Sequence, residues 1–170
     1  MRPIVIALQT MTLVVCCAFS PLAFSHTHGE AQAQMSLNEG SLNLELTLPM
    51  EILVGFERAP RSENEKQRWN QALTDLSQTD ALWRMPASAA CKAQAPKTTL
   101  PSWGKSEHTD VVITYLWQCE RPQALDQLQT QLFERFKRLR RIELVHVTAK
   151  GQGMTKLTPQ KPIWTTGSAK

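Results

Sequence analysis

The sequence predicts an α+β fold: a mostly antiparallel β-sheet with one or two helices packed on it and one disulfide. Residues 42–48 alternate apolar and polar side chains, as a half-buried strand does. Residues 111–119 are rich in β-branched and aromatic side chains, which favour strands. Residues 69–76 repeat apolar side chains at helical spacing. Because the expected strands outnumber the expected helices, the helices should lie on a sheet.

The first expected element is a β-hairpin over residues 31–48. Residues 38–40, Asn-Glu-Gly, supply turn chemistry between its two arms. The second arm carries leucines at even positions, so they share one face, which we expect in the core. Residues 52–60 follow as an apolar run that closes in a loop.

A helix is expected to begin after Ser62. Ser62 and Glu65 form a capping box, in which each side chain satisfies a free backbone donor of the other residue. The helix should run for about four turns with one apolar stripe facing the core. That stripe consists of Trp69, Ala72, Leu73 and Leu76.

The middle of the chain combines irregular segments with a central strand. We expect a short strand at residues 82–85, a turn at 86–90 and a loop at 96–101. Residues 111–119 should form the central strand of the sheet.

Two periods compete in residues 122–139. One interpretation is a strand at 127–132 followed by a helical turn at 133–139, which would bury Phe133 and Phe136. The other is one continuous helix. Both remain open at the level of sequence.

The chain should close with another hairpin. Residues 141–148 alternate as a strand, 151–153 read as a turn, 154–157 as the partner strand, and 159–164 as an edge or tail.

Residues 1–25 have the pattern of a signal peptide. Arg2 is their one charge, an apolar stretch follows, and Ala23-Phe24-Ser25 is a small-x-small cleavage site. The apolar stretch is too short for a confident membrane span. We therefore expect cleavage near Ser25, a soluble exported product without stable membrane insertion, and a single α+β metal-binding domain over residues 26–170.

Charge and cysteine content narrow the function. The net charge of +4 is too small to indicate nucleic-acid binding. Cys91 and Cys119 are the two cysteines left after cleavage, and we expect them to form a disulfide that stabilises the fold by roughly 3.5 kcal/mol. The alternative, half of a zinc site, is disfavoured because zinc cysteines usually come in close pairs.

The sequence contains no G-x-S-x-G, H-E-x-x-H or phosphate-binding glycine loop, so we expect no enzyme. Residues 135–141 carry five positive charges around two apolar residues. This segment is either a solvated face or a basic face that docks on an anionic membrane or an acidic partner.

The histidines are the candidate metal ligands. His26 and His28 would begin the processed chain, where a terminal amine, backbone amides and a third-position imidazole suit Cu(II) or Ni(II). Zinc would instead need further ligands from elsewhere in the fold. The alternative is a solvated terminus without a ligand role.

A second pair of candidate ligands lies just before the central strand. His108 and Asp110 point to one face of an extended backbone, so an imidazole and a carboxylate could share a cation. We expect them to matter only if the fold brings them near His26 and His28. His146 lies inside a strand pattern and is expected to be a packed or solvent-facing residue.

The order of short blocks along the chain resembles the ZrgA family, small periplasmic proteins that bind zinc and are linked to zinc uptake. The blocks are HTHGEAQ (26–32), LVGFERAP (53–60), AC (90–91), EHTD (107–110), YLWQC (115–119), LFERF (132–136), KGQ (150–152) and LTP (157–159). The resemblance implies a periplasmic protein that holds Zn2+ without catalysis and supports a zinc ABC transporter component. It also implies the strand interpretation for residues 128–132.

By motif position, the resemblance makes His26, His28, His108 and Asp110 the candidate zinc ligands. Two positions depart from the family pattern. Residues 92–106 contain no histidine where family members carry a histidine-rich stretch, and Arg58 stands where a histidine is expected. These departures predict a reduced zinc capacity.

Overall fold

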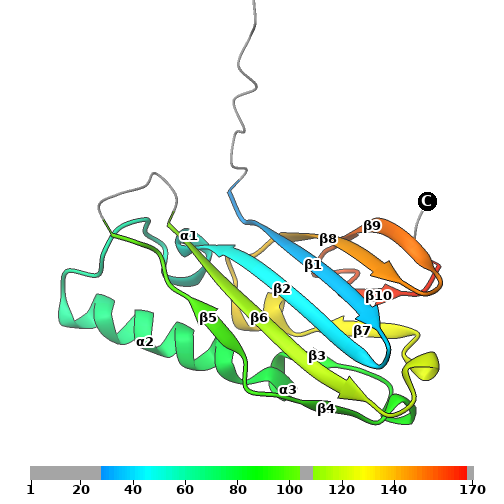
Figure 1. Ribbon diagram of the computed structural model, residues 1–170. Coiled ribbons are helices and arrows are strands. Elements are labelled where there is room, and N and C mark those ends of the chain that lie inside the picture. The colour runs from blue at the N-terminus through cyan, green and yellow to red at the C-terminus, as the bar shows by residue number, and fades with distance from the viewer. Residues whose placement is uncertain (1–27, 104–108, 168–170) are drawn as a thin grey trace, which may run out of the picture.

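The computed structural model describes residues 28–103 and 109–167, which form two β-sheets and several helices (Figure 1). Within these residues, the larger sheet has seven strands in the order β4-β6-β2-β1-β8-β9, with β5 also paired to β6. Its strands are β1 (Glu30–Asn38), β2 (Ser41–Pro49), β4 (Cys91–Ala93), β5 (Lys97–Thr99), β6 (Asp110–Cys119), β8 (Arg141–Thr148) and β9 (Gly151–Leu157). The described strand pairs are antiparallel except β1 with β8, which is parallel.

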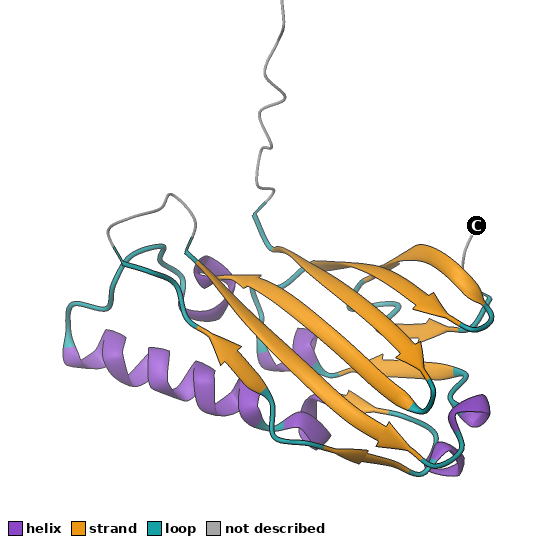
Figure 2. Cartoon of the chain, viewed as in Figure 1, coloured by secondary structure: helices purple, strands orange, loops and turns teal. Residues whose placement is uncertain are grey.

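The smaller sheet has three strands in the described residues, and one long helix and several short ones accompany the sheets (Figure 2). Its order is β10 (Ile163–Thr165), β7 (Gln127–Thr130) and β3 (Trp83–Arg84). The helices are α1 (Met50–Val54), α2 (Glu63–Ser77), α3 (Thr79–Leu82) and α4 (Leu132–Arg135), with 3₁₀ turns η1 (Ala87–Ala89) and η2 (Pro122–Ala124). This confirms the predicted α+β class with a mostly antiparallel sheet.

The core lies between the inner face of the larger sheet and a layer made of α2 and the smaller sheet. Tyr115 of β6 joins both parts of that layer. Its hydroxyl donates a hydrogen bond to the Leu76 carbonyl of α2 at 2.9 Å, and its ring meets Trp83 of β3 edge to face at 5.7 Å. The even-numbered leucines of β2 are fully buried, as the period-two pattern predicts.

The two strongest local patterns are confirmed. The hairpin predicted at residues 31–48 is β1 and β2, with Asn38 opposite Ser41. The capping box also forms, because the Ser62 hydroxyl accepts from the Glu65 backbone N–H at 3.2 Å and the Glu65 carboxylate accepts from Ser62 at 3.3 Å. Local chemistry therefore decides where α2 begins.

The strand-then-turn interpretation of residues 122–139 holds. β7 is followed by the single turn α4, and Phe133 and Phe136 are both buried. The Thr130 hydroxyl accepts from the Leu132 backbone N–H at 3.1 Å, and the Gln131 N–H donates to the Leu82 carbonyl at 2.8 Å. These bonds end the strand and start the turn, which a continuous helix would not allow.

Three expectations differ from the structure. The apolar run expected over residues 52–60 begins in the helix α1, which was not predicted. This short helix buries four apolar side chains in five residues, and Gly55, at φ +85°, ends it. Residues 97–99, expected as loop, form β5, an exposed strand held by backbone pairing with β6, so its side chains carry no core pattern. The turn expected at 151–153 belongs to β9, because Gly153 pairs with His146 and the chain reverses before Gly151.

The predicted disulfide forms between Cys91 and Cys119, which are also direct partners in the β4–β6 ladder. No helix among the described residues is both long and apolar enough to cross a membrane. Residues 1–25, expected as a signal peptide, lie outside the described residues.

Candidate metal centre

The chain enters the sheet through a fixed turn at Gly29. Gly29 has φ +84°, and its carbonyl accepts from the backbone N–H groups of Arg140 and Arg141 at 2.8 and 3.2 Å. A Cβ at this position would lie 2.8 Å from the Arg138 carbonyl oxygen, so a side chain would clash with backbone. Gly29 thus fixes the place of His28 at the start of β1.

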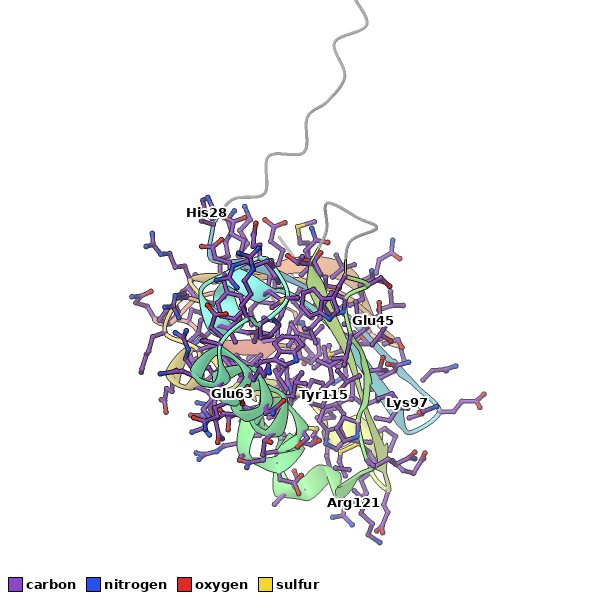
Figure 3. The ribbon with its side chains drawn as sticks, turned by 90° about the vertical axis from the view of Figure 1, so that its left-hand side faces the viewer. His28, Glu45, Glu63, Lys97, Tyr115 and Arg121 are labelled. Carbon is purple, nitrogen blue, oxygen red and sulfur yellow. A yellow bond between two sulfur atoms is a disulfide. The ribbon has the colours of Figure 1, made fainter. Side chains whose placement is uncertain are left out.

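His28 and Glu51 form a short polar contact at this end of the sheet. The His28 Nδ1 atom lies 2.5 Å from the Glu51 Oε2 atom, and the His28 side chain is 82% exposed against 28% for Glu51. The hydrogen bond and the charge of Glu51 raise the pKa of His28, with a further contribution from Glu57. Figure 3 places His28 at the surface of one end of the molecule, with Arg121 at the other end.

The first residues of β6 lie at the same end as His28 and Glu51. The Met50 backbone N–H donates to the Thr109 carbonyl at 3.0 Å, and Asp110 is the ladder partner of Pro49. Asp110 is half-buried. Because Glu51 directly follows Met50, the start of β6 and the His28 partner are tied to the same turn of chain.

The described residues place two members of the predicted ligand set at the same end of the sheet. His28 and Asp110 lie at the same end of the sheet, whereas His26 and His108 fall outside the described residues. In residues 28–103 and 109–167, no group of three or more His, Cys, Asp or Glu side chains is arranged to hold a metal ion.

The His28–Glu51 pair nevertheless has the chemistry of a metal-binding histidine. Metal-ligating histidines usually donate one ring N–H to a carboxylate, which fixes the tautomer and ring orientation and leaves the other nitrogen for the metal. Glu51 engages Nδ1, so Nε2 is the nitrogen that remains for an ion. Imidazole and carboxylate are both ligand types that zinc accepts.

Glu51 is the site residue that sequence reasoning missed. It lies 23 residues from His28 in the chain, directly before the run interpreted as apolar over residues 52–60. The feature of the sequence that could have indicated it is one acidic residue among apolar ones: the other four side chains of α1 are all buried. Helical periodicity turns that one residue outward, toward the start of β1.

Arg58 stands where the family resemblance suggests a histidine, and its guanidinium is bound elsewhere. It forms two hydrogen bonds with the Glu65 carboxylate, at 2.7 and 2.9 Å, and lies 5.0 Å from the centre of the Phe56 ring. The bonds from Arg58 and the Arg61 backbone N–H lower the pKa of Glu65 to about 2. Arg58 therefore locks the loop before α2 and supplies no metal ligand.

His146 takes no part in this region, in line with the packed interpretation of its strand pattern. It is 4% exposed, and its ring meets Trp164 edge to face at 5.3 Å. Its Nδ1 atom has no hydrogen-bond partner, and burial lowers the pKa of the imidazole.

The basic segment 135–141 is partly neutralised. Arg135 pairs with Asp75, and Arg141 pairs with Glu30 at 2.5 Å. Its remaining cations are exposed and belong to no ion pair among the described residues; they are Lys137, Arg138 and Arg140. The Arg138 carbonyl and the Arg140 side chain lie against Gly29, whereas the Arg138 guanidinium lies against Gly55.

A comparison with curated proteins gives no match. A comparison with protein families gives a match to the ZrgA family zinc uptake protein over residues 25–166, which covers both sheets, all four α-helices and the His28–Glu51 pair. On this match, the chain belongs to the ZrgA family of zinc uptake proteins.

Proposed function

We propose that this protein binds Zn2+ in the periplasm and supports zinc uptake by a zinc ABC transporter component, without catalysing a reaction. Membership of a zinc uptake family supports the role in uptake. The observation that carries the metal-binding part is the 2.5 Å contact between His28 Nδ1 and Glu51. It orients an exposed imidazole in the way that metal-binding histidines are oriented.

In this proposal His28 binds zinc through Nε2, and Glu51 is the positioning residue. His26, two residues earlier in the chain, and His108, next to Thr109, are proposed as further ligands. The hydrogen bond from the Met50 N–H to the Thr109 carbonyl supports a contribution from this part of the chain, because it ties the start of β6 to the turn that carries Glu51. Asp110 is proposed as the carboxylate ligand.

Copper and nickel are the alternative ions at a free terminus. Cleavage after Ser25 would give His26 a terminal amine, and a square-planar site of amine, amides and His28 imidazole would need no residue of β6. Zinc in a tetrahedral site would need ligands from another element of the fold.

Isothermal titration of zinc into correctly processed protein tests the proposal. Replacing His28 with Ala should remove most of the affinity, and replacing His108 with Ala should weaken zinc binding while leaving copper almost unchanged. Replacing the buried His146 with Gln is the matched control, since it removes an imidazole far from the start of β1. Equal zinc affinity in all of these proteins would exclude the shared zinc site.

One observation favours a second candidate function, a periplasmic interaction module with a weak or vestigial metal site. Three exposed cations, Lys137, Arg138 and Arg140, lie in the segment that packs against Gly29, and their positive charge is available to an acidic partner. Under this alternative, reversing these charges would abolish association with a transporter component, while removing His28 would have no effect. Co-purification of the transporter with each variant separates the two functions.

A further inference from the structure

A second candidate site is lined by residues that take no part in the proposed zinc centre. A cavity of about 350 Å3 opens where the end of α2, α3, β3 and α4 meet. Its volume is at the lower end of the roughly 300 to 1,000 Å3 that small-molecule sites occupy. Its lining residues are Asp75, Gln78, Ala81, Leu82, Arg84, Gln131, Glu134 and Arg135.

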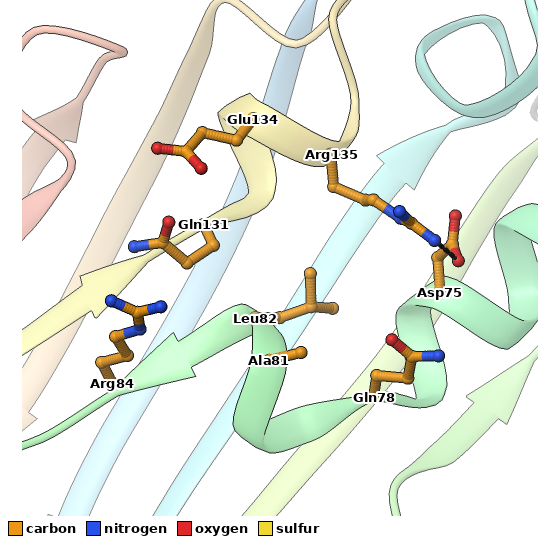
Figure 4. A pocket seen from close by; sticks show the side chains of 8 residues that line it. All are labelled: Asp75, Gln78, Ala81, Leu82, Arg84, Gln131, Glu134 and Arg135. Carbon is orange, nitrogen blue, oxygen red and sulfur yellow. Dashed lines mark hydrogen bonds and ion pairs between the residues drawn. The ribbon is translucent and has the colours of Figure 1, made fainter.

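The polar side chains of this cavity are arranged around an apolar floor (Figure 4). Leu82 and Ala81 lie at its centre, with Gln78 on one side and Arg84 on the other. Gln131 lies between Arg84 and Glu134 in the same view. Only Leu82 and Ala81 of the eight lining residues are apolar, so polar and charged groups dominate the cavity and would decide which ligand it takes.

Two of the four charged residues neutralise each other and form the wall. Arg135 donates to the Asp75 carboxylate, which is 9% exposed and also accepts from Gln71 at 2.8 Å. This ion pair joins α4 to α2 across one side of the cavity. It fixes the wall and leaves Arg135 without free charge for a ligand.

The other two charged residues stay unpaired. Arg84 and Glu134 both line the cavity, yet neither belongs to an ion pair among the described residues. The cavity therefore presents one free cation and one free anion that do not reach each other, with an amide between them. With the Arg135–Asp75 pair included, its formal net charge is zero.

This charge pattern limits the class of ligand. A polyanion such as phosphate would meet a single free arginine and an opposing Glu134 carboxylate. A metal ion would find carboxylates but no imidazole or thiolate in the lining. A molecule that carries both a carboxylate and an ammonium group would pair with both free charges at once, with charge-assisted hydrogen bonds at each end.

We infer that this cavity binds a free α-amino acid as its zwitterion, with the carboxylate on Arg84, the ammonium group on Glu134 and a polar side chain directed over Leu82 toward Gln78. Arginine pairs with carboxylates through two parallel N–H donors, which fixes orientation as well as charge. The Gln78 and Gln131 amides favour a ligand whose side chain is itself an amide. This site is independent of the proposed zinc centre.

The test uses L-glutamine as the probe, together with two derivatives that each lack one charge. Titrations into the ¹⁵N-labelled protein, followed by backbone amide shifts, should show saturable changes around α3 and α4 with L-glutamine. N-acetyl-L-glutamine, without the ammonium group, and L-glutaminamide, without the carboxylate, should each bind about ten- to a hundredfold more weakly, as expected for one lost charged hydrogen bond.

Variants assign each charge to its residue. Arg84→Gln should remove the preference for glutamine over glutaminamide, and Glu134→Gln should remove the preference for glutamine over its N-acetyl derivative. Both side chains are exposed, so the variants should fold normally, and Arg61→Gln and Glu45→Gln are the matched controls for the same charge changes elsewhere on the surface. No saturable binding of L-glutamine, equal binding of all three probes, or tighter binding of inorganic phosphate would overturn the inference.

Discussion

The carboxylate that holds His28 offers the sharpest test of the proposed zinc centre. Glu51→Gln keeps the size and hydrogen-bonding reach of the side chain but removes its charge. His28 is 82% exposed, so packing holds its ring only weakly and the 2.5 Å contact with Glu51 carries the orientation. Loss of such a partner typically weakens metal binding by about 10- to 100-fold, and we expect a deficit of this size at alkaline pH.

The deficit should depend on pH in a definite direction. Glu51 raises the pKa of His28 above the ordinary histidine value of 6.5, so in the wild type the ring stays protonated up to a higher pH. Zinc requires the neutral ring, and the proton therefore competes with zinc more strongly in the wild type than in Glu51→Gln. As the pH falls, this competition weakens wild-type binding first, and the difference between the two proteins should shrink.

Calorimetric zinc titrations at about pH 6, 7 and 8, which span the ordinary histidine pKa, measure this dependence. Glu45→Gln is the control, because Glu45 is an exposed carboxylate on the outer face of β2 and its loss changes the net charge equally. Equal affinity of wild type and Glu51→Gln at alkaline pH would refute the positioning role of Glu51. A deficit that stays constant over the three pH values would refute the link to the His28 proton.

Three further predictions concern the fold. Removing the disulfide by Cys91→Ala should lower the free energy of unfolding by about 2 to 5 kcal/mol in urea, while the native wild type should show no reactive thiol in labelling. Tyr115→Phe should cost about 1 to 3 kcal/mol, because it strips the Leu76 carbonyl of a buried donor; Thr47→Val, which removes a half-buried hydroxyl on β2, should cost far less in the same urea assay. Burial lowers the pKa of His146 below its value in the unfolded chain, so the stability that the neutral ring contributes is present above about pH 6.5 and is lost as the pH falls toward the lowered pKa. The free energy of unfolding of His146→Gln should lack this loss at acid pH. Identical pH profiles of stability for the wild type and His146→Gln would contradict this role of His146.

The local elements could be predicted from sequence because their causes lie within a few residues. The leucines of β2 alternate with polar residues, and that period alone decides which side chains enter the core. Ser62 and Glu65 satisfy each other's backbone donors across three positions, which decides where α2 starts.

Pairing between strands could not be predicted in the same way. The alternation in β1 and β8 marks both as strands but does not indicate that they pair with each other in parallel, with Glu30 opposite Arg141. β5 lies within residues 96–101, which were expected as a loop. All three of its side chains are exposed, so no core pattern marks it as a strand, and its strand state depends on pairing with the backbone of β6. Backbone hydrogen bonds carry no residue signature, so such contacts exist only once the sheet is assembled.

The candidate site likewise has features that the sequence predicts and features that only the fold decides. The sequence by itself determined the ligand types, since imidazole and carboxylate chemistry belongs to His28 and Asp110 whatever their surroundings. The tertiary structure alone decided that Glu51 meets His28, because that contact needs the buried face of α1 to turn Glu51 outward and the Gly29 turn to bring the chain start beside it. Residue identity sets what a side chain can bind, whereas the proximity of side chains 23 residues apart is set by the packing of the elements that carry them.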